Sequence, residues 1–302
     1  MAALMPSEAV SEAVRLFPQQ VCFVVADVAA AVAYAESLLG WGPFHTFQAD
    51  VAEASYREWR GRKVTDVALG MAGSVQVEFL HVHQGHDTTA DYQAQYGSGF
   101  QHIGTYCEDL AGATARMNNL GASINEENEY PGIKFAFVNA PTGPGMFELL
   151  QPTQALQENK GISDSAQAVA AQEPKPAIDR ATIVTADMDT ALAFYTAAFR
   201  WTETEAQEDT LLWGDKRHPV LRHIARAGKL ELELIQPLSD SANPYTEHLV
   251  RGDHGLVHAG GPADFSPPGE PAGEGSWEKN DEHFAFHDWP GGPRSLQIRQ
   301  SP

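Results

Sequence analysis

The stretch QQVCFVVADVAAAVAYAESLLGWG, residues 19–42, decides the fold class of this chain. It opens with a run rich in valine, meets Asp27, and passes into an alanine-rich segment that ends near Trp41. A β-branched run followed by small residues predicts a strand that leads into a helix. Asp27 is suited to begin that helix, because its carboxylate can accept hydrogen bonds from the first free N–H groups and favours the positive end of the helix dipole.

The same pattern returns along the chain. IDRATIVTADMDTALAFYTAAFRW (residues 178–201) repeats it around Asp187, and FQHIGTYCEDLAGATARMNNLGA (residues 100–122) repeats it around Asp109. A fourth copy, GLVHAGGPADF at residues 255–265, keeps the strand but runs into a Pro/Gly-rich stretch, so we expect a shortened loop there and no helix. An internal repeat of this kind predicts a protein built from similar units.

Runs of alternating character follow the first three openings. Alternation of apolar and polar residues predicts half-buried antiparallel strands. These runs are KVTDVALGM (63–71), SVQVEFLHV (74–82), IKFAFVNA (133–140), GMFELLQP (145–152) and KLELELIQP (229–237). Each unit therefore has the order β-α-β-β-β, and two units side by side form a curved sheet around a cleft.

A change of composition divides the chain into two halves. The segment between Gln154 and Pro176 is polar, rich in alanine and closed by two prolines, which is typical of a linker. We therefore predict an α+β protein with two paired-unit domains, at residues 15–153 and 176–300, and a linker at 154–175. A chain of 302 residues with 43% hydrophobic residues is long enough to fill a core in each.

The charge balance narrows the classes of partner. The chain has 40 acidic residues against 20 Lys and Arg, which gives a formal net charge of -20. Such a charge repels nucleic acids and anionic membrane surfaces, so we expect neither as a partner. A solvated acidic surface that keeps the protein soluble is the simplest interpretation.

The cysteine content and the apolar segments favour a cytoplasmic protein. Two cysteines, Cys22 and Cys107, provide no disulfide framework of the kind found in small secreted proteins. The first residues, MAALMPSEAVSEAVRLF, contain two glutamates where a secretion signal needs an unbroken apolar stretch. Val21 to Leu39 is also interrupted by acidic residues, so we expect no membrane span.

These units resemble the vicinal oxygen chelate superfamily, which includes glyoxalase I, methylmalonyl-CoA epimerase, extradiol dioxygenases and bleomycin- or fosfomycin-resistance proteins. The resemblance covers nearly the whole chain, and WGPF (41–44) and RGRKV (60–64) are similar to the epimerase-like branch. It implies tandem domains. It also implies that the first strand of each unit carries a metal ligand seven positions before the capping Asp, and that the last strand carries an acidic ligand.

Those positions in the first half hold four metal-competent side chains. Gln20 and His102 stand seven positions before the capping aspartates, and Glu78 and Glu148 lie on the last strands. An amide oxygen, an imidazole and two carboxylates suit Zn, Ni, Co, Mn or Fe(II), and the sequence does not choose among them. Such a site leaves positions for water or for two neighbouring substrate oxygens.

The resemblance implies a metal-dependent isomerase, epimerase or lyase that acts on a small carbonyl compound or an acyl thioester through an enediolate-like intermediate. Glu148, and secondarily Glu78, would combine ligation with proton transfer. A metal-free protein that binds a drug-like ligand, as resistance members do, is the alternative. Extradiol dioxygenation is less favoured, because that branch uses two His and one Glu and Gln20 occupies one His position. The expected partner is a small-molecule substrate, and a homodimer is left open.

The corresponding positions in the second half are Arg180, Glu233, His258 and Gln297. This is a poor ligand set, because an arginine does not deprotonate in proteins and its fixed charge repels a cation. We therefore expect a degenerate second domain.

Other residues favour plainer roles. Cys22 shares strand parity with Gln20 and so faces the cleft, where a small buried apolar filler is the simplest role. The histidines of HVHQGH (81–86) fit a solvent-facing strand end and loop. Arg60 and Arg62 fit solvated surface positions, with a substrate carboxylate or a CoA phosphate as the alternative partner.

Overall fold

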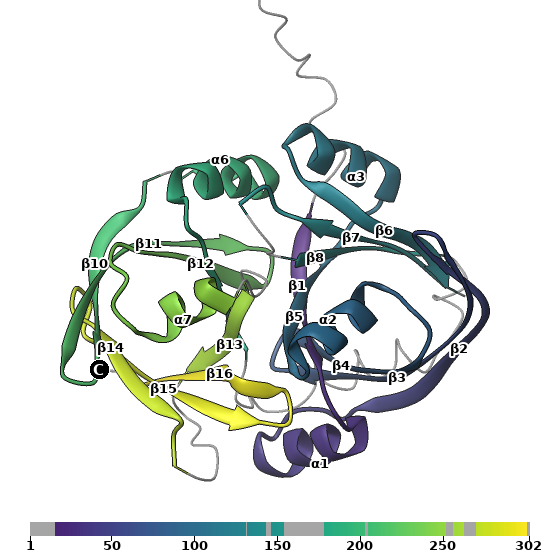
Figure 1. The fold of residues 1–302 in the computed structure, drawn as a ribbon, viewed down its shortest axis with the longest axis horizontal. Helices are drawn as coiled ribbons and strands as arrows, with labels where there is room; N and C mark the ends of the chain where they lie inside the picture. The colour runs from purple at the N-terminus through teal and green to yellow at the C-terminus, as the bar shows by residue number, and fades with distance from the viewer. Residues whose placement is uncertain are drawn as a thin grey trace, which may run out of the picture.

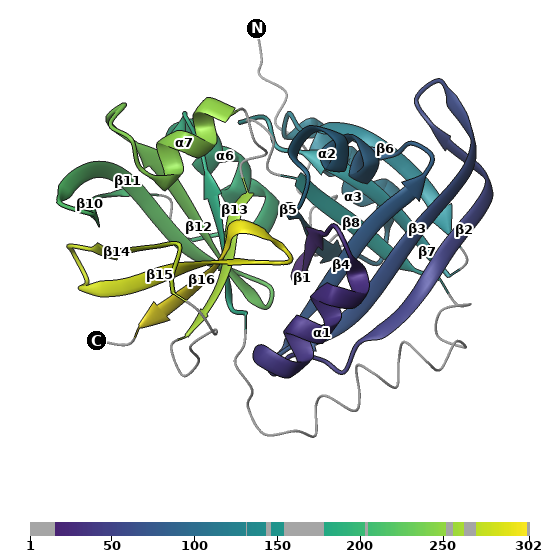
Figure 2. The ribbon, with the colours of Figure 1, turned by 60° about the horizontal axis from the view of Figure 1, so that its bottom comes forward.

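The computed structural model describes residues 16–130, 132–142, 146–153, 178–202, 205–251, 256–262 and 270–300. They form two eight-stranded sheets, one in each half of the chain, which lie side by side (Figures 1 and 2). The predicted linker and residues 263–269 lie outside the described residues. The Pro/Gly-rich stretch at residues 265–277, where a shortened loop was expected, ends in a strand, Gly273–Trp277, so the loop prediction was wrong for that part. The α+β architecture of paired units in tandem is confirmed.

The first sheet joins its two units through their first strands. Strand β1 pairs in parallel with β4 and antiparallel with β5, and the whole order is β2-β3-β4-β1-β5-β8-β7-β6. The units therefore pair within this half, as expected. The elements are β1 (Phe17–Val24), α1 (Val28–Leu38), β2 (His45–Tyr56), β3 (Trp59–Ala72), β4 (Val75–Gln84), α2 (Thr88–Tyr96), β5 (Gly99–Tyr106), α3 (Leu110–Asn119), β6 (Ser123–Tyr130), β7 (Ile133–Asn139) and β8 (Met146–Pro152).

The second sheet repeats this topology and closes on itself. Its order is β10-β11-β12-β9-β13-β16-β15-β14, and β10 pairs with β14 through partners such as Leu211 and Trp277. The elements are β9 (Arg180–Val184), α6 (Met188–Phe199), β10 (Gln207–Trp213), β11 (Lys216–Ala227), β12 (Leu230–Pro237), α7 (Pro244–Arg251), β13 (Leu256–Pro262), β14 (Gly273–Trp277), β15 (Glu282–Trp289) and β16 (Gly292–Gln300).

The repeat aspartates begin their helices as predicted. Asp27, Asp109 and Asp187 each accept a hydrogen bond from a backbone N–H of the first helical turn, at 3.0 to 3.1 Å. A carboxylate at this position satisfies an N–H group that has no partner within the helix. The chain enters α1, α3 and α6 in the same way, which sets the equivalent strands in equivalent places.

Helices α2 and α7, which join the two units of each half, did not emerge from the repeat pattern. The sequence of α2, TTADYQAQY, lacks an apolar stripe, so its periodicity gives no helical signal. The helix is defined by its N-terminus, where Asp87 accepts a hydrogen bond from Ala90 N. Figure 1 shows α2 and α7 inside the curve of their respective sheets.

One apolar core spans the two halves. Trp289 of the second half packs edge-on against Phe23 and Trp41 of the first, and Tyr195 on α6 packs against Phe147 on β8. Side chains of one parity on β1 therefore enter the shared core, and those of the other parity face the inside of the first sheet. Among the described residues, none of the helices combines the length and the apolar character needed to cross a bilayer.

Candidate metal centre

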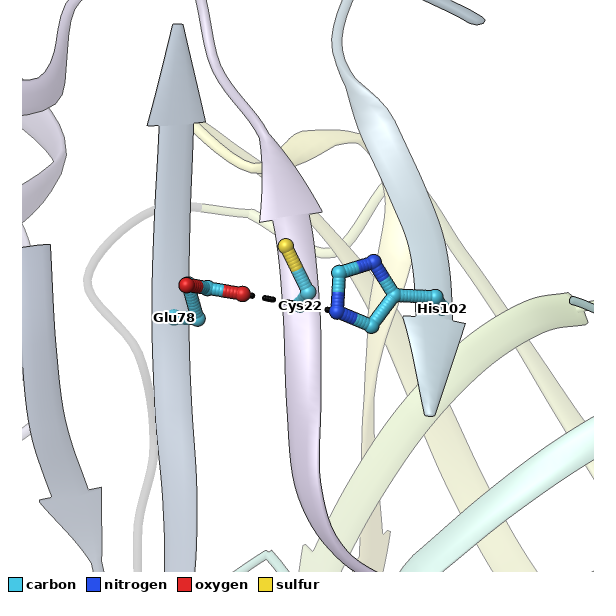
Figure 3. Close-up of side chains that lie close together, drawn as sticks. All are labelled: Cys22, Glu78 and His102. Carbon is cyan, nitrogen blue, oxygen red and sulfur yellow. Dashed lines mark ion pairs between the residues drawn. The ribbon is translucent and has the colours of Figure 1, made fainter. Parts of the chain in front are cut away.

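The register of three adjacent strands aligns three chemically active side chains. Cys22 on β1 is the partner of Glu78 on β4 and of His102 on β5, so the three stand in one row across the sheet (Figure 3). In the neighbouring row, Gly104 on β5 is the partner of both Gln20 and Glu148. The sheet thus carries all four predicted ligands on the same face, in two adjacent rows.

His102 is the centre of this group. Its Nε2 atom lies 3.1 Å from a carboxylate oxygen of Glu148 and 3.4 Å from one of Glu78. The imidazole is fully buried, and neither contact has hydrogen-bond geometry, so Nε2 has no hydrogen-bond partner. Buried polar atoms without partners are rare and call for an ion or another group to satisfy them. The structure therefore brings three of the four predicted ligands together around one buried nitrogen.

Gln20 supplies a second buried atom without a partner. Its Nε2 donates to Gln76 Oε1 at 2.8 Å, whereas its Oε1 is buried and accepts no hydrogen bond. This oxygen lies above Gly104, where a Cβ atom would overlap with it. The absence of a side chain at 104 therefore gives the Gln20 amide its place.

Cys22 belongs to the group more closely than the sequence indicated. Its Sγ, a ligand atom of Glu78 and one of His102 all lie within 4.8 Å of one another. The thiol is also packed against Val67 and Leu80, as expected of an apolar filler. Burial and the charge of Glu78 raise its pKa well above the ordinary value, so the thiol is protonated in the metal-free protein. Strand parity with Gln20 was the signal for its position.

The charges of the site hold a proton on His102. Burial alone would lower the pKa of His102. The neighbouring charges of Glu148 and Glu78 have the larger effect and raise this pKa to about 9. Burial raises the pKa of Glu148, against the opposing effect of His102. Because a metal ligand must be deprotonated, a divalent cation here would replace that proton. One nitrogen, two carboxylates and an amide oxygen or a sulfur form a donor set that fits Zn, Ni, Co, Mn or Fe(II).

The other polar groups singled out in the first half lie on the surface. Arg62 pairs with Asp50 and is more than half exposed, and Arg60 donates to backbone oxygens of its own hairpin. His83 bonds to Asp66 on the outward face of the sheet. None of these groups contacts the candidate site.

The second half places different side chains at the same register positions. Thr182 is the partner of Glu233 and of His258, and Gly260 is the partner of Arg180 and of Gln297. The spatial arrangement of the predicted ligands is therefore repeated.

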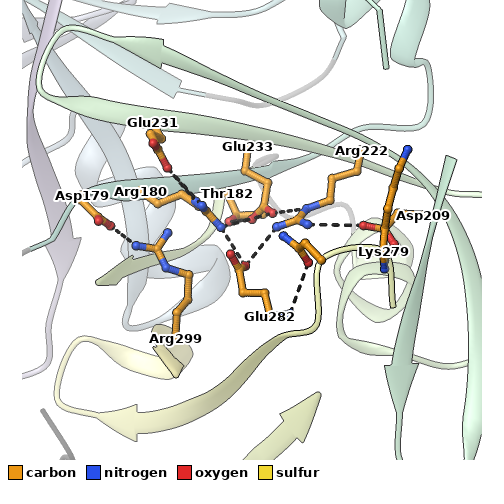
Figure 4. A network of polar contacts seen from close by, with 11 residues as sticks. Asp179, Arg180, Thr182, Asp209, Arg222, Glu231, Glu233, Lys279, Glu282 and Arg299 are labelled. Atoms are coloured by element: carbon orange, nitrogen blue, oxygen red, sulfur yellow. Dashed lines mark hydrogen bonds and ion pairs between the residues drawn. The ribbon is translucent and has the colours of Figure 1, made fainter. Parts of the chain in front are cut away.

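Two arginines neutralise the acidic group of the second half (Figure 4). Arg222 donates to Glu233 at 2.6 Å, Thr182 donates to its other oxygen at 2.6 Å, and an Arg180 nitrogen lies 3.8 Å away. Burial alone would raise the pKa of Glu233. The charges of Arg222 and Arg180 have the larger effect and lower this pKa to about 2. Arg222 and Arg180 thus supply the positive charge that a cation would supply in the first half.

Comparisons with known proteins place this geometry in a family. The model of the Glyoxalase/Bleomycin resistance/Dioxygenase superfamily matches residues 19–137. No curated protein matches the chain.

Solved structures that match the chain include the three that follow. A mutant of 4-hydroxymandelate synthase from Streptomyces coelicolor is 14% identical with a TM-score of 0.61, over 95% of this chain and 92% of that one. A hypothetical protein from Staphylococcus aureus is 10% identical with a TM-score of 0.50, over 96% and 99%. Methylmalonyl-CoA epimerase from Mycobacterium tuberculosis is 17% identical with a TM-score of 0.35, over 51% and 97%.

The matched residues contain Gln20, Glu78 and His102, and the topology of the first half returns in the second. The chain therefore carries a domain of the glyoxalase/bleomycin resistance/dioxygenase superfamily in its first half and repeats the fold of that domain in its second.

Proposed function

We propose that the first half binds one divalent cation through His102, Glu78 and Glu148, with the amide oxygen of Gln20 as a further ligand. One observation carries this proposal. The buried Nε2 of His102 has no hydrogen-bond partner and lies 3.1 and 3.4 Å from two carboxylate oxygens. In the second half, the equivalent glutamate is already neutralised by arginines, so we propose no cation there.

We propose that the protein acts as an isomerase, epimerase or lyase on a small carbonyl compound or an acyl thioester. The bound cation would polarise the carbonyl and stabilise the charge of an enediolate-like intermediate. Glu148 takes a proton from the carbon next to the carbonyl and returns it to the neighbouring carbon or to the other face. Glu78 is the second candidate for this transfer.

Of the two substrate classes, the contacts favour the small carbonyl compound. A CoA thioester needs cations for its phosphates, and the arginines considered for that role are Arg60 and Arg62. Arg62 is paired with Asp50, and Arg60 is bound to its own hairpin. Neither lies at the site.

Elemental analysis of the full chain, purified without added metal, tests the cation site. We expect about one divalent cation per chain, and a loss of affinity greater than about 100-fold in His102→Ala, since removing even an outer partner costs 10- to 100-fold. His258→Ala, the matched change in the second half, should leave the metal content of the protein unchanged. Absence of metal, with no binding of added zinc or cobalt, would refute the proposal, as would full retention in His102→Ala.

Glu148→Gln tests the proton transfer. The rate of solvent deuterium exchange at the carbon next to the carbonyl of dihydroxyacetone should fall by about 10²- to 10⁴-fold. The variant should keep its metal, because an amide oxygen can still ligate. Glu127→Gln, on an exposed position of β6, is the control and should match the parent protein. An unchanged exchange rate in Glu148→Gln would remove Glu148 from the reaction.

A further inference from the structure

We infer that two glutamines, Gln101 and Gln76, orient the ligand atoms of His102 and Gln20 toward the cation. This inference rests on the metal site proposed above and assigns the residues that hold its ligands ready. Gln101 precedes His102 on β5 and is fully buried with it. Gln76 lies beside Gln20 on the neighbouring strand.

The contact between Gln101 and His102 determines which ring nitrogen faces the carboxylates. Gln101 Oε1 lies 2.8 Å from His102 Nδ1. An amide oxygen only accepts, so Nδ1 carries the proton and donates it. When the ring is neutral, Nε2 is then left with its lone pair, and Nε2 is the atom that faces Glu148 and Glu78. A hydrogen bond to the far nitrogen of a ligating histidine fixes its tautomer and the direction of its ring.

The amide of Gln101 is itself held in this orientation. Its Nε2 points to Thr89 Oγ1 at 3.5 Å and to Met146 Sδ at 4.0 Å. Thr89 lies in the first turn of α2, whose N-terminus is fixed by Asp87 and by Glu126. The position of His102 is therefore tied to α2 through the side chain of Gln101.

Gln76 does the equivalent task for Gln20. Its Oε1 accepts from Gln20 Nε2 at 2.8 Å and from Tyr106 Oη at 3.1 Å. With Nε2 engaged, the Gln20 amide cannot turn over without losing this bond, and its Oε1 stays directed away from Gln76. That oxygen is the buried acceptor without a partner. Both glutamines thus accept a hydrogen bond from the N–H group of a ligand residue. The other polar atom of that residue, which can bind a cation, is left without a hydrogen bond.

Zinc affinity of the full chain, measured by competition with a chelator, tests this assignment. Gln101→Leu removes the acceptor and should weaken zinc binding by about 10- to 100-fold, whereas Gln101→Glu keeps an acceptor and should stay close to the parent. Gln76→Leu should weaken binding by about tenfold, since amide oxygen is the weaker ligand. Gln93→Leu is the matched control, because Gln93 bonds to the backbone of Val82 and to no ligand residue.

A second measurement separates this inference from the proposed function. In metal-free protein, the Nδ1–H proton of His102 should give a slowly exchanging NMR signal that Gln101→Leu abolishes, with an unfolding midpoint lowered by the loss of one buried hydrogen bond. Zinc binding in the parent with equal affinity in Gln101→Leu would overturn the positioning role alone. A parent that retains the NMR signal but binds no zinc would refute the metal site and leave the hold of Gln101 on His102 established. Absence of the signal in the parent would overturn that hold.

Discussion

The two halves of the chain pair their central strands in the same register, and they differ in the side chains at the matched positions. Glu78 and Glu233 both lie on the fourth strand of their halves. In each half the glutamate is the partner of a small residue on the first strand, and that residue is in turn the partner of a histidine on the fifth strand. Glu78 faces His102 and is partly exposed, at 14% of its side chain. Glu233 is fully buried and bound by Arg222. The same backbone arrangement therefore carries the candidate metal ligands in the first half and an internal ion pair in the second.

The halves also differ in how the sheet ends. The first sheet leaves β2 and β6 as its edges, where Asn128 donates to the backbone oxygen of Ser55 at 3.0 Å. The second sheet joins the equivalent edges by backbone hydrogen bonds between β10 and β14. The open sheet of the first half carries the candidate metal ligands. The closed barrel of the second half carries Glu233 paired with arginines. This difference supports the proposal that the cation site lies in the first half.

Matched glutamate changes should break this comparison most clearly. Glu233→Gln removes one of the two carboxylates that Arg222 and Arg180 share, while that of Glu282 remains. Losing one member of a buried pair costs about 3 to 5 kcal/mol, so we expect a loss toward the lower end of this range. Glu78→Gln removes a carboxylate that crowds Glu148, so the free energy of unfolding of the metal-free protein should change by less than about 1 kcal/mol. Urea unfolding of both variants measures this, and equal losses would mean that the two glutamates have the same role.

The pH dependence of stability should differ in sign between the halves. The folded pKa of His102, about 9, exceeds the ordinary value of 6.5, so its contribution is complete below pH 6.5 and is lost as pH rises through 9. This loss is on the order of 3 kcal/mol. Glu233, with a folded pKa of about 2, contributes fully above its ordinary value of 4.5 and loses this contribution as pH falls through 2.

Urea unfolding of metal-free protein from pH 6 to pH 9.5 measures the contribution of His102. His102→Gln should flatten the curve in this window, and a parent curve that is already flat would contradict the prediction. Zinc affinity should run the other way and rise by up to about tenfold per pH unit, because the cation replaces the His102 proton.

The repeat made most of the fold predictable from sequence. Asp27, Asp109 and Asp187 mark strand-to-helix transitions by their capping chemistry, which is local and depends on few neighbours. Helix α2 was not predictable in this way, because Asp87 and a tertiary contact with Glu126 define its start. The closure of the second barrel was also beyond local pattern, since it depends on pairing between β10 and β14, far apart in the sequence.

The candidate site was predictable in part for the same reason. Its candidate ligand positions are those that the resemblance to the vicinal oxygen chelate superfamily implies, and the repeat shows where they fall in this chain. Strand parity placed Cys22 on the cleft face but did not show its closeness to Glu78 and His102. Gln101 and Gln76 are defined by the orientation of their side chains, so no spacing singles them out. Arg222 likewise reaches Glu233 from an adjacent strand.

The glycines at the centre of each ladder offer the finest test of the comparison. A Cβ at Gly104 overlaps the Gln20 side chain, including its own Cβ at 2.7 Å, whereas a Cβ at Gly260 meets the backbone oxygen of Gln297 at 2.8 Å. Gly104→Ala should therefore displace the Gln20 oxygen and weaken zinc binding by about tenfold. Gly260→Ala should force β13 and β16 apart, cost about 1 to 3 kcal/mol in urea unfolding, and leave zinc affinity unchanged. If both glycines affect stability alone, Gln20 is not a ligand and the cation is held by His102 and the two carboxylates without it.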